Sequence, residues 1–239
     1  RLQQEHPGAQ VVITGCAATE NLLANLEGVS RCIAPREDWM GEFQDAVKDL
    51  LPGEKMERKD DTTDHLRVTG FSVQTRAFLK IQDGCDLGCT FCIVPRLRRK
   101  PRDKPLEMVV EEARSLAEAG HREVVVCGIS VGLYGRDTGG ANLADVLSAL
   151  LRIPALERIR VSSLHPNELT EDLLEVWASS PRMMPHVHLP LQSGSNRILQ
   201  AMHRNYTTED FLDAVVRAKR VLPDPPFNTD VIVGFPGET

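Results

Sequence analysis

The sequence predicts an α/β protein with a parallel sheet, and two observations support this. From Arg76 onward, short apolar runs alternate with segments whose apolar residues recur at helical spacing. A helix between successive strands is the connection that parallel strands require. The chain has 239 residues, of which 41% are hydrophobic, so it is long enough to bury a sizeable core.

The chain before Arg76 predicts a short buried strand and two helices. The strand is expected at residues 11–14, because Val-Val-Ile-Thr is a compact apolar run, and the helices at 19–26 and 38–50. Residues 51–75 contain a proline, a glycine and a mixed-charge run, and they offer little apolar surface for packing. We therefore expect a linker there.

The chain from Arg76 predicts five strands joined by helices. Residues 85–100 form a long loop that is rich in cysteine and basic residues. Gly120 follows the first helix of this part, in the usual position just beyond a helix end. The strands are expected at 76–82, 124–127, 158–163, 186–190 and 228–234, and the helices at 105–119, 142–151, 170–178, 195–202 and 208–221.

Charge and cysteine content narrow the classes of protein. The formal net charge of −6 argues against a surface coated in positive charge for bulk nucleic-acid binding, although it allows one local basic patch. Apolar runs fall short of the roughly 18 residues of a membrane helix, so no membrane partner is expected. Three of the six cysteines fall within eight residues, which favours metal-binding thiolates in a reducing cytoplasm over disulfides. Because the chain starts at Arg1 and stops directly after an apolar strand, we expect a fragment that is open at both ends.

The strongest motif is the Cys-x3-Cys-x2-Cys loop formed by Cys85, Cys89 and Cys92, which follows a strand directly. Cysteine thiolates are the usual ligands of iron–sulfur clusters. Three thiolates would leave one iron of a four-iron cluster open to a substrate's amino and carboxylate groups. Gly84 and Gly88 would let the backbone wrap tightly around such a cluster. A structural zinc site needs a fourth ligand, and a disulfide would leave one of the three thiols unused.

Ligands of parallel sheets bind beyond the carboxyl ends of the strands, and this rule selects further candidates. They are Gly128 after the second strand, Ser162, Ser163 and His165 after the third, and Gln192 and Ser193 after the fourth. For each polar residue, an ordinary loop or capping role is the alternative. His186 and His188 alternate along one strand and are expected to be structural, and Cys127 is expected in the core, whereas Cys32 matches no motif.

A basic run lies between Arg96 and Lys104 and holds six positive charges in nine residues. One interpretation is a solvated loop. The other is a patch for the carboxylate of a cofactor and for nucleic-acid phosphates, because the run adjoins the cysteine loop.

Three segments resemble the methylthiotransferase branch of the radical S-adenosylmethionine (SAM) enzymes. They are Arg76-Ala-Phe-Leu-Lys-Ile-Gln-Asp-Gly-Cys85 with the cysteines behind it, His188-Leu-Pro-Leu-Gln-Ser-Gly-Ser195, and Asp230-Val-Ile-Val-Gly-Phe-Pro-Gly-Glu-Thr239. The first segment and Met202-His-Arg-Asn-Tyr206 look most like the enzymes that modify threonylcarbamoyladenosine in tRNA.

The resemblance implies a partial parallel (β/α) barrel preceded by the end of a smaller α/β domain. Residues 1–50 would be the C-terminal portion of an N-terminal methylthiotransferase domain, and residues 76–239 a radical SAM domain that lacks its last strand. The full-length enzyme would hold two [4Fe-4S] clusters. Cys16 would be one ligand of the second cluster, so this chain alone is expected not to complete methylthiolation.

The resemblance also implies a reaction and its cofactors. The cluster at Cys85, Cys89 and Cys92 would cleave SAM into methionine and a radical, and a methylthio group would replace hydrogen at adenine C2 of the modified tRNA nucleotide. Phe91 would cover the adenine of SAM. The family also places a ligand of SAM at Arg98, and the methionine end of SAM near Gly128, while Ser163, Gln192 and Ser193 would line the cofactor site.

The resemblance leaves several alternatives open. The substrate could be isopentenyladenosine in tRNA or an aspartate of a ribosomal protein, and an iron–sulfur electron carrier is the alternative from another class. The partners would be tRNA and a flavodoxin- or ferredoxin-like electron donor. The chain departs from the family at Arg99, where the family usually has glycine.

Overall fold

The computed structural model describes residues 11–14, 29–33, 75–98, 100–136 and 139–238. The chain divides into two compact units, Arg1–Leu66 and Arg67–Thr239. In the first unit, β1 (Val11–Thr14) pairs in parallel with β2 (Val29–Ile33). The expected strand at 11–14 is confirmed, whereas β2 was not predicted, because serine and arginine interrupt its apolar pattern. The helices expected at 19–26 and 38–50 lie outside the described residues, as does the linker apart from its last residue.

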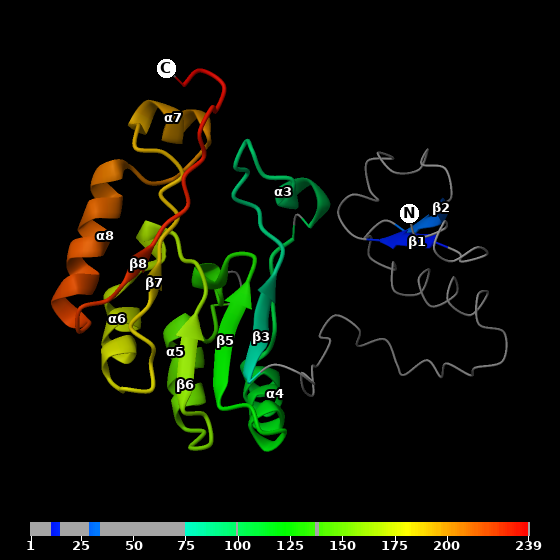
Figure 1. Cartoon of the computed structure of the whole chain (residues 1–239), viewed down its shortest axis with the longest axis vertical. Helices are drawn as coiled ribbons and strands as arrows, with labels where there is room; N and C mark the ends of the chain where they lie inside the picture. Colours follow the sequence, from blue (N-terminus) through cyan, green and yellow to red (C-terminus); the bar gives the residue numbers. More distant parts are fainter. Residues whose placement is uncertain (1–10, 15–28, 34–74, 99, 137–138, 239) are drawn as a thin grey trace. The chain divides into compact units, whose positions relative to one another are not determined.

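The second unit contains a mixed four-stranded sheet and a separate parallel pair of strands. In the sheet, β3 (Arg76–Asp83), β5 (Glu123–Gly128) and β6 (Arg158–Val161) are parallel, and the short β4 (Arg102–Asp103) runs antiparallel to β3, giving the order β4-β3-β5-β6. The pair consists of β7 (Val187–His188) and β8 (Phe227–Asn228). Figure 1 shows β3, β5 and β6 side by side. The predicted α/β class with a parallel sheet is confirmed.

Most helices of this unit pack against another helix that is next or next but one to them along the chain. They are α3 (Val94–Leu97), α4 (Leu106–Glu118), α5 (Leu143–Leu151), α6 (Glu171–Ala178), α7 (Asn196–Ala201) and α8 (Thr208–Val221), with single 3-10 turns at η3 (Val131–Leu133) and η4 (Pro166–Glu168). Helix α4 contacts β3 and α5, α5 contacts α6, and α6 contacts α8. The five helices predicted after Arg76 all lie within one residue of their expected ends.

Local sequence explains where these helices begin and end. Asn142 accepts a hydrogen bond from the Asp145 backbone N–H while the Asp145 carboxylate accepts one from the Asn142 N–H, so two orphan donors at the start of α5 are satisfied. Thr207 and Asp210 form the same capping box at the start of α8. Gly120 takes a φ of +96° beyond the end of α4, a backbone conformation that glycine adopts without steric cost.

The core of the second unit lies between the sheet and the helices. Strand β5 is flanked by β3 and β6, and Val124 and Val126 on it are fully buried. A strand with neighbours on both sides and cover on both faces reads as a continuous apolar run, which is why the sequence located it. Trp177 of α6 is the largest fully buried side chain, and its indole N–H donates to the Met184 carbonyl.

Three expectations about strands are wrong in extent. The strand expected at 228–234 is limited to β8 at Phe227–Asn228, with one further bridge between Gln192 and Val231. Val231 and Val233 are 55% and 83% exposed, so this apolar run lacks the cover that a buried strand has. The strands expected at 158–163 and 186–190 shorten to β6 and β7. Helix α3 and strand β4 lie in and just after the segment expected to be a loop.

The amino end of the sheet holds a buried carboxylate. Glu123 at the start of β5 is paired with Arg76 of β3 (2.7 Å) and with Arg158 and Arg160 of β6 (2.9 and 3.3 Å). Burial alone would raise the pKa of this carboxyl group. The hydrogen bonds from Arg158 and Arg160 and the charge of Arg76 outweigh burial, so the pKa lies below its ordinary value. This group of ion pairs therefore joins the three neighbouring strands β3, β5 and β6.

We expect Glu123→Gln to destabilise the second unit by about 1–2 kcal/mol, because hydrogen bonds to charged groups are lost while the arginines keep partial access to water. The lowered pKa gives a contribution that is fully present above about pH 5 and is lost as the pH falls through the folded-state pKa. Urea unfolding of the variant should therefore vary less with pH between about pH 5 and 3. Glu175→Gln, the same change at an exposed position of α6, is the control, and equal losses in both variants would contradict the prediction.

Candidate active site at the carboxyl end of the parallel strands

The cysteine loop leaves β3 through a tightly packed glycine. Gly84 has a φ of +74°, and a Cβ atom there would lie 2.2 Å from the Lys100 carbonyl oxygen. The Cys85 N–H then donates to the Arg98 carbonyl at 2.9 Å, which closes the base of the loop. Gly88 also has a positive φ, of +70°. Both glycines that were expected to let the backbone wrap tightly therefore adopt left-handed conformations.

The three cysteines of the loop are free thiols, and that of Cys85 is buried. Burial raises the pKa of Cys85, and the nearby thiols of Cys89 and Cys92 add to the effect. The Leu87 N–H points at the Cys85 sulfur at 3.5 Å. Among the described residues, no three acidic, histidine or cysteine side chains converge on a single metal ion. A four-iron cluster binds each thiolate at a different iron, so its ligands are spread more widely than the ligands of a single metal ion. This loop of three free thiols fits such a cluster.

Gln82, at the end of β3, ties the cysteine loop to the next strand. Its side chain is buried, its Nε2 donates to the Gly84 carbonyl at 2.8 Å, and its Oε1 accepts from the Ser130 N–H at 2.8 Å. Because both ends of the amide are occupied, the loop after β3 and the turn after β5 are held at one spacing. The sequence analysis did not select this residue, although its place at a strand's carboxyl end was a usable signal.

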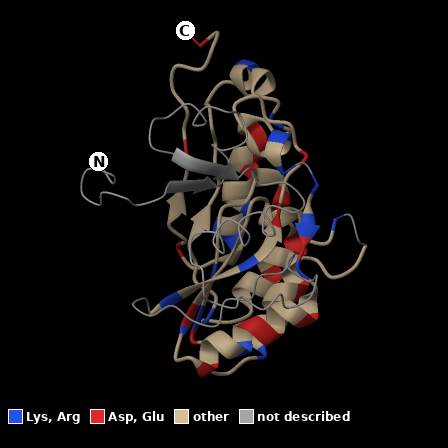
Figure 2. Cartoon of the chain, turned by 90° about the vertical axis from the view of Figure 1, so that its right-hand side faces the viewer, with Lys and Arg blue, Asp and Glu red and all other residues tan. Residues whose placement is uncertain are grey.

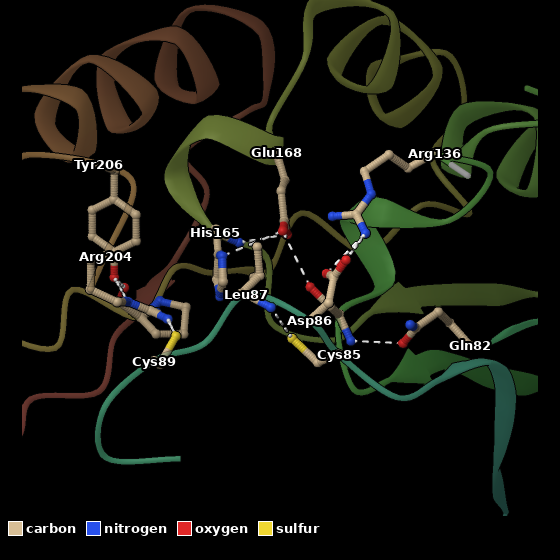
Figure 3. A network of polar contacts seen from close by, with 12 residues as sticks. Gln82, Cys85, Asp86, Leu87, Cys89, Arg136, His165, Glu168, Arg204 and Tyr206 are labelled. Carbon is tan, nitrogen blue, oxygen red and sulfur yellow. Dashed lines mark hydrogen bonds and ion pairs between the residues drawn. The ribbon is translucent and has the colours of Figure 1, made fainter. Parts of the chain in front are cut away.

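The loop after β6 contributes His165 and Glu168. The Glu168 carboxylate accepts from the His165 backbone N–H at 2.9 Å and from the Ser130 hydroxyl at 3.3 Å. Burial lowers the pKa of His165 to about 4, with a further contribution from the charge of Arg204, and burial raises the pKa of Glu168. His165 is therefore neutral at neutral pH. Its ring centre lies 6.0 Å from that of Tyr206, with the two ring planes tilted by 58°. Figure 3 shows these residues beside the cysteine loop.

Two arginines from distant parts of the chain reach the cysteine loop. Arg136 binds both carboxylate oxygens of Asp86, at 2.9 and 2.8 Å. Arg204, which follows α7, donates from Nη1 to the Cys89 sulfur at 3.2 Å and from Nε to the Tyr206 hydroxyl at 2.9 Å. Sequence reasoning missed both arginines as site residues, because contacts over 50 and 115 positions leave no local signal.

The remaining candidates lie at or just after the carboxyl ends of β5, β6 and β7, and their surroundings differ. A Cβ atom on Gly128 would lie 2.7 Å from the Gln82 carbonyl oxygen, so packing between β3 and β5 already requires glycine there. Ser163 is exposed, and the buried Ser162 hydroxyl has no hydrogen-bond partner among the described residues. Gln192 has a φ of +66°, and the buried Ser193 hydroxyl accepts from the Ser195 N–H at 3.2 Å. Contacts of these residues with SAM remain a prediction.

The basic run is partly engaged in contacts within the protein. Lys104 is buried and pairs with Glu112 of α4 at 2.5 Å, and Arg98 pairs with Asp83 at 3.1 Å. Lys104 is therefore not available to phosphates, which corrects its inclusion in an accessible patch. Arg96, Lys100 and Arg102 are exposed, and Arg99 lies outside the described residues. Figure 2 shows basic and acidic residues interspersed along the described elements.

The other histidines and cysteines that the sequence singled out lie outside the contacts of the cysteine loop described above, or outside the described residues. His188 pairs with Asp230 at 3.1 Å, and the His186 Nδ1 is buried without a hydrogen-bond partner among the described residues. Cys127, on β5, is half-buried, and burial raises its pKa. Cys16 lies outside the described residues, and Cys32 belongs to β2. Phe91, expected to cover an adenine, is 40% exposed and has the Arg204 guanidinium 5.8 Å from its ring centre.

Comparison with known proteins gives a consistent family. The model of the Radical SAM superfamily matches residues 79–239. The whole chain is 39% identical to the threonylcarbamoyladenosine tRNA methylthiotransferase MtaB of Chlamydia pneumoniae and 37% identical to MtaB of Bacillus subtilis, and it covers 54% of each. It is 36% identical to a tRNA-2-methylthio-N(6)-dimethylallyladenosine synthase of Cereibacter sphaeroides, over 55% of that protein. The chain spans about half the length of these relatives.

Solved structures share the fold. The cobalamin-dependent radical SAM enzyme OxsB, with aqua-cobalamin and SAM bound, matches 92% of this chain and 36% of its own, with a TM-score of 0.63 and 15% identity. The radical SAM methyltransferase TsrM of Kitasatospora setae matches 65% of this chain and 30% of its own, with a TM-score of 0.51 and 20% identity. Described residues include no helix with the length and apolarity needed to cross a membrane. With two thirds of its length matched by the family model, the chain belongs to the radical SAM superfamily, whose members use a [4Fe-4S] cluster and SAM.

Proposed function

We propose that this chain is the radical SAM part of a methylthiotransferase that modifies adenine C2 of N6-threonylcarbamoyladenosine in tRNA. The observation that carries the proposal is the three-cysteine loop at the carboxyl end of β3, in a chain whose full length aligns with MtaB at 39% and 37% identity. Residues 76–239 would be the radical SAM domain, and residues 1–50 would belong to the preceding methylthiotransferase domain.

Cys85, Cys89 and Cys92 would hold the cluster, which supplies the electron for the reductive cleavage of SAM. The chain's own residues would shape the site around it. Gln82 and the glycine turn at Gly84 set the path of the cysteine loop, and the Arg136–Asp86 pair fixes the loop's first turn against the segment after β5. The exposed ring of Phe91 offers a face for the adenine of SAM.

The residues that follow β6 and β7 would complete the wall of the SAM site. Ser163, Gln192 and Ser193 lie after β6 and β7, where hydroxyl and amide groups can bind the ribose and the carboxylate of SAM. His165 is neutral, so it can accept or donate a hydrogen bond there without adding charge.

The test is mass spectrometry of tRNA nucleosides from cells with and without the gene that encodes this chain. Loss of the methylthio group from threonylcarbamoyladenosine alone, restored by the gene, is the expected result. Loss from dimethylallyladenosine instead would favour the second candidate substrate, which the relative at 36% identity supports. If both nucleosides keep the methylthio group, a ribosomal-protein aspartate becomes the substrate to examine. If the purified protein does not cleave SAM, an iron–sulfur electron carrier becomes the better assignment. A flavodoxin- or ferredoxin-like protein is the proposed electron donor.

A further inference from the structure

Arg204 donates a hydrogen bond to the sulfur of Cys89 in the cysteine loop, and the proposed function gives this arginine no role. Helix α7 ends with His203 in a left-handed conformation, at a φ of +56°. The His203 N–H bonds to the Gln200 carbonyl at 3.0 Å and the Arg204 N–H to the Leu199 carbonyl at 2.9 Å. These two bonds are the Schellman pattern of a helix end, and they place Arg204 as the first residue beyond the turn.

The end of α7 is attached to the cysteine loop by the backbone and side chain of Thr90. The Thr90 N–H donates to the Met202 carbonyl at 3.2 Å, and its hydroxyl donates to the Ala201 carbonyl at 3.1 Å. Arg204 therefore leaves α7 directly beside Cys89, the residue before Thr90. The contact between Arg204 and Cys89 is a consequence of how two backbone segments are joined.

The Arg204 guanidinium is held from several sides. Its Nε donates to the Tyr206 hydroxyl at 2.9 Å, and that hydroxyl donates to the Pro190 carbonyl at 2.7 Å. The guanidinium carbon lies 4.9 Å from the Tyr206 ring centre and 5.8 Å from that of Phe91. The hydrogen bond of Nε and the contacts with the two rings fix the orientation of the guanidinium. Its Nη1 is then directed at the Cys89 sulfur at 3.2 Å, as Figure 3 shows. A planar guanidinium fixed in this way keeps one donor aimed at one acceptor.

We propose that Arg204 is a positioning residue that hydrogen-bonds the Cys89 thiolate and raises the reduction potential of the [4Fe-4S] cluster held by the cysteine loop. The inference rests on the proposed assignment of Cys85, Cys89 and Cys92 as cluster ligands. Reduction adds one negative charge to the cluster. A cation and an N–H donor at a ligand sulfur stabilise the reduced state more than the oxidised state, and hydrogen bonds to sulfur are a recognised determinant of cluster potential.

The experiment is a redox titration of the anaerobically reconstituted chain, with dithionite as the one-electron reductant and the reduced cluster followed by electron paramagnetic resonance. We expect Arg204→Gln to make reduction about tenfold less favourable, which is a shift of about 59 mV to lower potential for a one-electron couple. Arg204→Lys keeps the charge but cannot reach Tyr206 and Cys89 together, so a smaller shift in the same direction is expected. Arg220→Gln, on the exposed end of α8, makes the same change of charge away from the loop and should leave the potential unchanged.

Iron content is measured in every variant, so that each result has one meaning. A wild-type potential in an iron-replete Arg204→Gln protein would overturn the inference. If that variant takes up no iron, the Arg204→Lys protein supplies the test, and an unchanged potential there has the same consequence. Loss of the cluster from both variants would show that Arg204 holds the loop rather than tunes the potential, which also overturns it. A wild-type chain that binds no cluster would instead refute the cysteine assignment on which the proposed function depends.

Discussion

Replacing Cys89 with alanine is expected to abolish the iron–sulfur absorbance of the reconstituted chain and, with it, SAM cleavage. Outer residues around a metal site typically cost about 10–100-fold in affinity when they are mutated, so loss of a direct ligand should cost at least about 100-fold. Cys85 lies within electrostatic reach of the other two cysteines, since Cys89 and Cys92 add to the burial that raises the pKa of Cys85. Cys85→Ala and Cys92→Ala should behave in the same way.

The matched control is Cys127→Ala. Cys127 is also a free cysteine in the part of the chain that the structure describes, but it lies on β5 rather than in the loop. Iron and sulfide analysis, together with the visible spectrum, should show a full complement of cluster in this variant. Retention of wild-type iron by Cys89→Ala would refute the cluster assignment. Equal iron loss in Cys127→Ala would show that the loop is not where the cluster binds.

Replacing Gly84 with alanine is expected to have the second largest effect. The left-handed φ of +74° costs roughly 1–2 kcal/mol for a residue with a Cβ atom. The new Cβ would also lie 2.2 Å from the Lys100 carbonyl oxygen and 2.9 Å from that of Arg98, and both are backbone atoms that cannot rotate away. Together these effects should reduce stability by about 2–5 kcal/mol. The loop base is displaced, so cluster uptake should fall sharply as well.

Gly120→Ala separates the two causes. Gly120 has a φ of +96°, but a Cβ atom there would meet no atom within 4 Å. The control therefore incurs only the cost of the left-handed backbone, roughly 1–2 kcal/mol, and should bind the cluster normally. Urea unfolding and iron content measured on both proteins give the comparison. Similar stability losses and similar iron content in the two variants would contradict the argument from steric overlap at Gly84.

Local patterns were enough to locate most of the second unit. Helices α4 to α8 were found within one residue of their ends, because apolar spacing and capping residues act within a few positions of each other. Buried strand β5 was also identified, since an unbroken run of valines is an equally local signal. By contrast, β4 has only two residues, and its existence depends on pairing with Gln82 and Asp83 of β3. Likewise, an apolar run predicted a long final strand, but only neighbouring strands could complete it.

The sequence by itself determined the elements on which the proposed chemistry rests. They are three cysteines at the spacing of cluster ligands, two glycines that let their loop turn, and an order of strands and helices that places this loop at the carboxyl end of a parallel strand. Only the tertiary structure decided which side chains surround that chemistry. Arg204 and Cys89 are 115 positions apart, and Arg136 and Asp86 are 50 apart. Tertiary structure also removed Lys104 from the basic patch by burying it against Glu112. The physical reason is that motif spacing reflects the local backbone, whereas charge pairing and hydrogen bonding depend on distances that exist only after the sheet and helices pack.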